Sequence, residues 1–148
     1  MLIGKKWRKK MKINTKVRYG FKALAYIAMN TEENKLVRIK EIAESQNISI
    51  QYLEQILFKL KNEKIIEGKR GPSGGYRLAM SPKEITLHKV YMILDDEVKV
   101  IDCNESDEHR QQCKDSICGS TCIWSKLDYA LTKILSDTTL EDFINNVK

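Results

Sequence analysis

The stretch "SIQYLEQILFKLKNEKIIEGKRGPSGGYRLA", Ser49 to Ala79, joins an amphipathic segment to a glycine-rich turn. Its first half places apolar residues at the i, i+3, i+4 and i+7 positions of one helical face, namely Leu53, Ile56, Leu57 and Leu60. Ser49 stands where a helix needs a side chain to cap its first free N–H groups. The pattern predicts a helix that begins after Ser49 and buries its leucine face.

Two more helices are predicted before this one. In "RIKEIAESQNI", Ile39, Ile42 and Ala43 form a short apolar stripe. Residues from about 16 to 30 repeat apolar side chains every three or four positions, beginning with Val17 and Phe21. Two helices joined by a tight turn form the helix-turn-helix arrangement, which is therefore expected within residues 38–66.

The polar face of the helix after Ser49 is a candidate for reading DNA. The residues that project away from the leucine stripe are Gln51, Tyr52, Glu54, Gln55 and Lys59. The N-terminal part of a recognition helix reaches base edges in the major groove, where glutamine pairs with adenine and glutamate with cytosine.

The second half of the stretch predicts a hairpin, with strand-like runs at 65–69 and 76–79 around "RGPSGG". Three glycines and a proline within six residues favour a turn, and glycine lets the backbone approach another surface closely. Lys69, Arg70 and Arg77 add positive charge, as in a wing that follows phosphates or enters the minor groove. A nucleotide-binding phosphate loop would instead need a following helix and a GK[ST] ending, which this segment lacks.

The candidate DNA-binding residues extend from the first helix to the wing. They are Lys16, Arg38, Ser49, Gln51, Tyr52, Glu54, Gln55, Lys59, Lys69, Arg70, Gly71, Pro72, Ser73, Gly74, Gly75 and Tyr76. Residues 11–80 carry 13 basic and 7 acidic side chains, whereas residues 81–148 carry 8 and 13. The basic first half therefore suits a polyanionic partner, and the acidic second half does not.

Residues 1–10 carry five basic side chains and no acidic one, and we expect them to be a disordered extension, with Met11 as an alternative start. No apolar segment follows them as in a secretory signal. No run approaches the roughly 18 apolar residues of a membrane span. We therefore expect a cytoplasmic protein that does not contact a membrane.

All four cysteines lie within "CNESDEHRQQCKDSICGSTC", at Cys103, Cys113, Cys118 and Cys122. Free thiols are usually buried, yet this segment is too polar to bury them, so the cluster favours metal chemistry in a reducing compartment. The spacing lacks the paired CxxC units of structural zinc sites, although zinc and a disulfide both stay open. A thiol enzyme would need a base beside one cysteine, for which His109 is the candidate, and acidic neighbours would raise a thiol pKa. We therefore expect no enzymatic activity.

A last long helix is predicted from Ile123. Its apolar residues share one face, and those expected at a dimer interface are Ile123, Leu127, Leu131, Ile134 and Leu135. Two-fold symmetry matches palindromic half-sites, which favours pairing, although this face could pack on its own domain instead. "DTTLEDFI" then predicts a terminal helix capped by Thr138 or Thr139.

"MKINTKVRYGFKAL", "ISIQYLEQILFKLK" and "KRGPSGGYRLA" resemble the IscR-type family of bacterial winged-helix transcription regulators, from Met11 to about Val147. Val17 departs from the glycine usual in that family. The resemblance implies a homodimer on a palindromic operator, with Arg70 in the minor groove and Glu54 and Gln55 at major-groove bases. It also implies a long C-terminal dimerisation helix.

The same resemblance implies that Cys103, Cys113 and Cys118 hold an iron–sulfur cluster. Where the family's named member has a histidine, this chain has Thr121, and we expect the adjacent Cys122 to be the fourth ligand. The resemblance favours [2Fe–2S] and leaves [4Fe–4S] open, since four thiolates can hold either.

The expected fold is mainly α with a small β wing, an α+β winged helix-turn-helix domain with a long dimerisation helix. We expect an extension at 1–10, the DNA-binding domain at 11–82, a connecting helix at 83–100, a cluster-binding loop at 101–122 and the dimerisation and terminal helices at 123–148. The expected function is operator binding, as a repressor, under control of the cluster. The alternative is a cluster-free regulator of cysteine or sulfur metabolism, controlled by a protein partner or by thiol oxidation.

Overall fold

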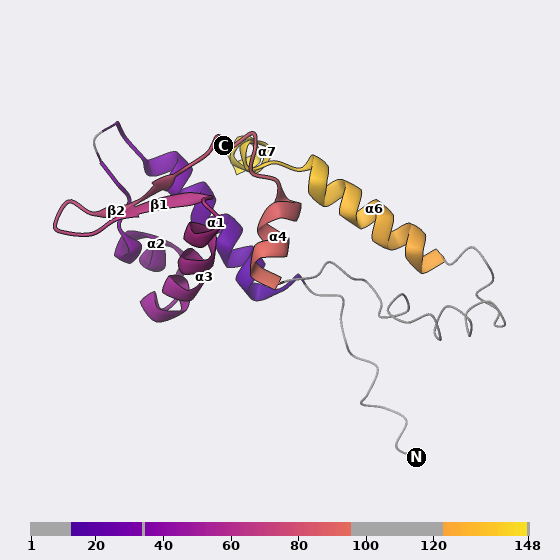
Figure 1. The fold of residues 1–148 in the computed structure, drawn as a ribbon, viewed down its shortest axis with the longest axis horizontal. Coiled ribbons are helices and arrows are strands. Elements are labelled where there is room, and N and C mark those ends of the chain that lie inside the picture. The colour runs from indigo at the N-terminus through magenta and orange to yellow at the C-terminus, as the bar shows by residue number, and fades with distance from the viewer. Residues whose placement is uncertain (1–12, 34, 96–122, 148) are drawn as a thin grey trace, which may run out of the picture.

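Three helices form the N-terminal core of the protein in the computed structural model (Figure 1). They are α1 (Thr15–Asn30), α2 (Ile39–Gln46) and α3 (Ile50–Asn62). The structure describes residues 13–33, 35–95 and 123–147. The predicted leucine face of α3 is buried, and Val17, Phe21 and Leu24 of α1 belong to the same buried core. The helix-turn-helix is therefore confirmed.

Local caps fix where these helices begin and how they are joined. The Ser49 side chain accepts a hydrogen bond of 3.1 Å from the backbone N–H of Tyr52, as the sequence predicts for the start of α3. Asn47, between α2 and α3, adopts a left-handed conformation with φ of 52°. Asparagine tolerates this conformation better than most residues, so the turn between the two helices can be tight.

The wing consists of β1 (Ile66–Lys69) and β2 (Gly75–Leu78), which pair antiparallel. Compared with the predicted runs at 65–69 and 76–79, β1 begins one residue later, and β2 both begins and ends one residue earlier. Val37, just before α2, exchanges two backbone hydrogen bonds with Tyr76, of 3.0 Å and 2.8 Å. This bridge attaches the wing to the helix-turn-helix and fixes its direction relative to α3.

The remaining helices are α4 (Leu87–Asp95), α6 (Ile123–Asp137) and α7 (Leu140–Val147). Helix α4 packs on α1, and α7 also contacts α1, with the rings of Phe143 and Phe21 in an edge-to-face contact at 5.2 Å. Figure 1 shows α6 beside α4, extending away from the N-terminal core. The described residues thus hold six helices and one two-stranded sheet, which confirms the predicted mainly α fold with a small wing.

The terminal helix α7 is capped as the sequence predicts, with Thr139 as the capping residue. The Thr139 backbone N–H and hydroxyl both donate to the Asp142 carboxylate, at 2.9 Å and 2.7 Å. These hydrogen bonds hold the pKa of Asp142 below its ordinary value. A bridge between Thr86 and Thr139 joins the start of α7 to the start of α4.

Among the described helices, none combines the length and apolar character that crossing a membrane requires. Of the predicted connecting helix at 83–100, α4 covers Leu87–Asp95, residues 83–86 are not helical, and 96–100 lie outside the described residues. The predicted extension at 1–10 and the predicted loop at 101–122 lie outside the described residues.

Candidate nucleic-acid interface

The exposed side of α3 carries a polar strip. Gln51, Glu54 and Gln55 are all solvent-exposed, whereas Leu53, Ile56 and Leu57 between them are buried. The burial of the leucine face holds α3 rigidly on the core, and the strip therefore points outward in a defined direction. This arrangement suits a helix that inserts into a groove of DNA.

Tyr52 lies differently from its predicted place on this outward face. It is half-buried, and its ring makes an edge-to-face contact with Tyr19 of α1 at 6.1 Å. Burial, with Tyr19 nearby, raises the pKa of Tyr52. The ring thus contributes to the α1–α3 contact, and sequence periodicity missed this because position 52 lies at the edge of the buried stripe.

The turn of the wing depends on glycine. A Cβ atom at Gly74 would lie 2.2 Å from the carbonyl oxygen of Lys69, and one at Gly75 would lie 2.6 Å from that of Val37. Gly75 also has φ of +156°. The Gly74 N–H donates to the Gly71 carbonyl at 2.9 Å, which closes the turn. Larger residues would push the turn open, so the glycines set the shape of the wing.

A groove runs between α3 and the wing, and its charge is strongly positive. Among the described residues, its charged lining consists of one acidic side chain, Glu54, and the basic residues Arg38, Lys40, Lys61, Lys69 and Arg70. The Arg38 guanidinium donates to the Pro72 carbonyl at 2.7 Å and so ties the start of α2 to the tip of the wing. Burial and the nearby Glu54 carboxylate raise the pKa of Tyr76 on the wing. Such a groove attracts phosphates.

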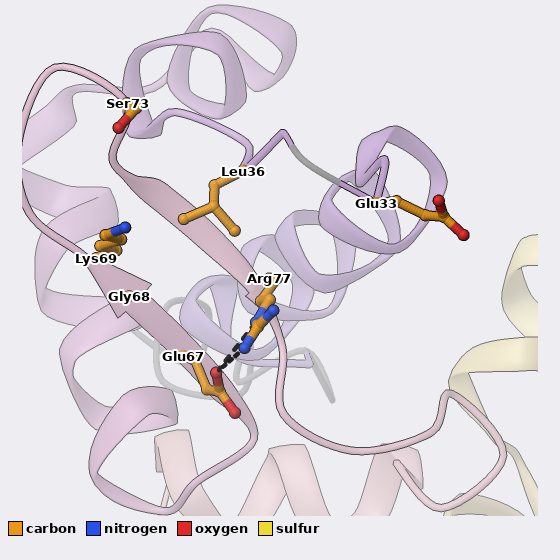
Figure 2. A pocket seen from close by; sticks show the side chains of 7 residues that line it. All are labelled: Glu33, Leu36, Glu67, Gly68, Lys69, Ser73 and Arg77. Carbon is orange, nitrogen blue, oxygen red and sulfur yellow. Dashed lines mark hydrogen bonds and ion pairs between the residues drawn. The ribbon is translucent and has the colours of Figure 1, made fainter.

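The opposite face of the wing is less basic than the sequence suggests. Figure 2 shows Arg77 reaching across the two strands to Glu67, at 2.8 Å, beside a pocket that is also lined by Lys69. Sequence reasoning counted Arg77 with Lys69 and Arg70 as a source of positive charge. Because Glu67 and Arg77 are directly paired in the strand register, most of that charge is offset locally.

The predicted DNA-binding residues gather on one side of the molecule, around α3 and the wing. The exposed ones are Arg38, Ser49, Gln51, Glu54, Gln55, Lys59, Lys69, Arg70, Gly71, Pro72 and Ser73, and the half-buried ones are Lys16, Tyr52, Gly74, Gly75 and Tyr76. Sequence reasoning missed Lys40 and Lys61, which line the groove. Lys61 is seven residues after Glu54, so helical spacing could have identified it.

A second, apolar hollow lies at the other edge of α3. It is lined by Lys16, by Leu94 of α4 and by a run of α3 that includes Gln51, Glu54 and Gln55. Leu94 also sits so close to Gly20 of α1 that a Cβ atom there would meet its Cδ1. Helix α4 therefore packs beside α3, and its Leu94 lines the same hollow as the polar strip.

The end of α4 is hydrogen-bonded to the start of α1. The Asn14 side-chain amide donates to the Asp95 carboxylate at 2.7 Å, and the Asn14 oxygen accepts from the Lys16 N–H at 2.9 Å. Burial and the Asp95 carboxylate, which is hydrogen-bonded to the Tyr91 phenol, raise the pKa of Tyr91. Asp95 thus links the last turn of α4 to the residue that caps α1.

The predicted dimer residues on α6 fall into two groups. Leu127 is 44% exposed and Ile134 62%, and Leu131 between them is half-buried. Leu135 is only 5% exposed and is therefore already covered by its own protomer. Leu135 therefore packs on its own domain, the alternative to a dimer interface that the sequence left open for this helix face. The side chain of Ile123 lies outside the described residues.

The four predicted metal ligands, Cys103, Cys113, Cys118 and Cys122, lie outside the described residues, as does His109. Within the described ranges, no group of three or more potential ligands from histidine, cysteine, aspartate and glutamate could hold a metal ion.

Residues 13–146 match the model of the Rrf2 family, whose description is iron-dependent transcriptional regulator. The chain is 31% identical over 137 residues to the HTH-type transcriptional regulator IscR of Photorhabdus laumondii. The aligned region covers 92% of this chain and 80% of that protein.

Two solved structures have a similar fold. The global cysteine regulator CymR of B. subtilis aligns with a TM-score of 0.70 and 29% identity, over 93% of this chain and 98% of that one. The IscR of T. potens aligns with a TM-score of 0.70 and 27% identity, over 93% of this chain and 89% of that one.

Proposed function

Since the chain belongs to the Rrf2 family of DNA-binding transcriptional regulators and is not an enzyme, we propose that it binds a palindromic operator as a homodimer. We further propose that an iron–sulfur cluster, held by the cysteines of residues 101–122, controls this binding and that the bound protein represses transcription. The observation that carries the proposal is the exposed polar strip of α3 beside a cationic groove closed by a glycine-built wing.

The assignment of roles follows from the chemistry of each surface. Gln51, Glu54 and Gln55 carry hydrogen-bonding groups that match base edges, so they would read the major groove. Lys69 and Arg70 stand on the wing with exposed side chains and would bind phosphates, with Arg70 reaching the minor groove. The two sets differ in what their loss would change, namely sequence preference for the first and salt dependence for the second.

The homodimer is supported by α6. This helix extends from the N-terminal core (Figure 1), and it exposes Leu127, Tyr129 and Ile134, the last at 62%. Large apolar side chains on a projecting helix lower the free energy of association when a second copy covers them. A two-fold axis through paired α6 helices would present two α3 helices to two operator half-sites.

The cluster is supported by the donor set. Four cysteines within residues 103–122 supply the four thiolates that a [2Fe–2S] or [4Fe–4S] cluster needs. Whether a cluster is bound, and in which oxidation state, would depend on iron–sulfur supply and on oxidants. The chain's own part is to hold this group between the end of α4 at Asp95 and the start of α6 at Ile123, and so to influence how both helices are placed.

Protein purified without oxygen is expected to contain iron and acid-labile sulfide in equal amounts and to absorb visible light. The Cys113→Ala, Cys118→Ala double variant should lose both the iron and the colour, because only two of four ligands remain. Ser116→Ala, from the same segment, is the matched control and should keep them. Colourless wild-type protein whose DNA binding is nevertheless regulated would refute the proposed iron–sulfur cluster. Stoichiometric zinc in that protein would indicate a zinc site instead.

Replacing both Lys69 and Arg70 with alanine is expected to weaken DNA binding and to flatten its salt dependence. The slope of log K against log salt should fall by about 0.9 for each lost phosphate contact, or roughly 1.8 per half-site. Arg77→Ala is the matched control, because its charge is offset by Glu67 at 2.8 Å, and it should change the slope by clearly less. Titrations at four salt concentrations measure the slopes. If Arg77→Ala changed the slope as much as each of the other two substitutions, Glu67 would not offset the charge of Arg77.

The second candidate is a cluster-free regulator of cysteine or sulfur metabolism that responds to a protein partner or to thiol oxidation. The fold similarity to CymR, a global cysteine regulator, favours it. Iron-free protein whose operator affinity changes when its thiols are oxidised, or when a protein partner is added, would support this candidate over the first.

A further inference from the structure

Phe58 is an exposed aromatic residue on an otherwise polar strip. Its side chain is 65% exposed, although its neighbour Leu57 is completely buried. Phe58 follows Gln51 by seven residues, Glu54 by four and Gln55 by three, so the four side chains occupy one outward side of α3. A lone apolar residue on a surface is common, so its exposure alone means little and its place on this strip is what matters.

The ring stands on the ridge between the two hollows that flank α3. One hollow is lined by Lys16, Gln51 and Leu94, and the other leads toward Lys69 and Arg70 on the wing. Glu54 and Phe58 line both. If α3 enters the major groove with its polar strip toward the bases, Phe58 enters with it and lies between the reading strip and the wing.

The spacing i, i+3, i+4, i+7 is also the spacing at which the recognition helix of a homeodomain places its four base-contacting side chains. Three of these positions here carry hydrogen-bonding groups and the fourth carries a phenyl ring. A phenyl ring cannot pair with the donors and acceptors of base edges. The apolar feature that the major groove offers is the C5-methyl group of thymine, which phenylalanine contacts favourably.

We propose that Phe58 determines specificity by packing against the C5-methyl group of a thymine in each half-site of the operator. This inference rests on the proposed function, in which α3 reads the major groove. The contact removes the methyl group and part of the ring from water, so its loss should weaken binding about fourfold, the value of burying one such carbon.

The test combines a change in the protein with the removal of one methyl group from the DNA. The operator is first selected from random duplexes by wild-type protein, and each of its thymines is then replaced in turn by uracil, which lacks the C5-methyl group. Wild-type protein is expected to lose about fourfold in affinity at one position per half-site. Phe58→Ala removes the ring from both half-sites, so it should bind the parent operator about 16-fold more weakly, about fourfold for each half-site. It should also be insensitive to uracil at that same position. Phe58→Leu, which keeps an apolar contact, should recover part of the sensitivity.

Each outcome decides the inference. Equal uracil sensitivity of wild-type protein and Phe58→Ala at every thymine would overturn it, and so would a wild-type protein that is insensitive throughout. If Phe58→Ala instead changes the oligomeric state in sedimentation and leaves the uracil profile unchanged, the ring contacts a protein surface and the inference fails while operator binding stands. If wild-type protein selects no sequence at all, the proposed function fails first and this inference with it. An unchanged melting temperature, expected for so exposed a ring, excludes misfolding.

Discussion

Gly74→Ala is expected to weaken DNA binding by about 100-fold for each half-site while the helical core stays folded. The new Cβ atom would lie 2.2 Å from the Lys69 carbonyl oxygen and 2.9 Å from both the Arg70 carbonyl carbon and the Gly71 carbonyl oxygen. These are backbone atoms of the same turn, so the clash cannot be relieved by moving a flexible side chain. The turn must open, and Lys69 and Arg70 then leave the phosphates that they are proposed to bind. Two charge-assisted hydrogen bonds are worth about 1.5–3 kcal/mol each, or about 100-fold at the lower value.

Fluorescence anisotropy with an operator duplex at fixed salt would measure this loss, and circular dichroism would report the melting temperature. Gly71→Ala is the graded control, because its Cβ atom meets nothing within 4 Å and its cost comes from φ of +112° alone. It should reduce affinity clearly less than Gly74→Ala does. Equal losses for the two variants would show that backbone strain at the tip, and not the steric closure of the turn, governs the wing.

The parts of the fold that were predicted from the sequence are those fixed by neighbours along the chain. The buried stripe of α3 follows from apolar residues at helical spacing, and its start follows from Ser49, whose hydroxyl reaches an N–H only three residues away. The cap of α7 is equally local, with Thr139 and Asp142 three residues apart. Such features depend on few other residues, and the sequence therefore determines them directly.

The missed features arise from residues that are distant in sequence. The bond from Arg38 to Pro72 joins residues 34 apart, and that from Asn14 to Asp95 joins residues 81 apart. Helical periodicity says which side of α3 is polar, but only the packing of α1 decides that Tyr52 turns toward Tyr19. Charge counts likewise could not show that Glu67 offsets Arg77, because this pairing depends on the strand register.

The cysteine cluster illustrates a different limit. Residue type alone points to thiolate chemistry, since four cysteines in a polar segment suit a soft metal. The choice among iron–sulfur, zinc and disulfide depends on which sulfurs the backbone brings together, and the spacing of these cysteines is compatible with all three. Metal analysis therefore decides this part of the proposal more directly than any further reading of the sequence.

Control of DNA binding from residues 101–122 requires a connection to α3, and α4 is suited to provide it. Asp95 ends α4 and is hydrogen-bonded to Asn14, the cap of α1, while Leu94 packs at Gly20 and lines the hollow beside Gln51 and Glu54. A shift at the end of α4 would therefore move the start of α1 and the support of the reading strip together. Energetic coupling needs such a contact to differ between the two states of the protein.

Asn14→Asp is expected to remove most of the control that we propose the cluster to exert on operator binding. The substitution keeps the oxygen that accepts from the Lys16 N–H at 2.9 Å, so α1 stays capped. It replaces the amide that donates to Asp95 at 2.7 Å with a carboxylate that repels it. We expect the ratio of operator affinities between cluster-bearing and cluster-free wild-type protein to lie within the usual range of about 5–150. In the variant this ratio should fall below about threefold.

Adding Asp95→Asn to that variant should restore the ratio, because the amide introduced at position 95 can then donate to the carboxylate introduced at position 14. Affinities of anaerobically prepared and chelator-treated protein, measured for wild type, both single variants and the pair, complete a double-mutant cycle. A ratio that stays at the wild-type value in Asn14→Asp would show that control bypasses this bond. A third outcome is that the ratio falls in Asn14→Asp and does not recover in the pair. Because the pair restores the hydrogen bond with its polarity reversed, this result would mean that the negative charge of Asp95 carries the signal, and not its hydrogen bond to Asn14.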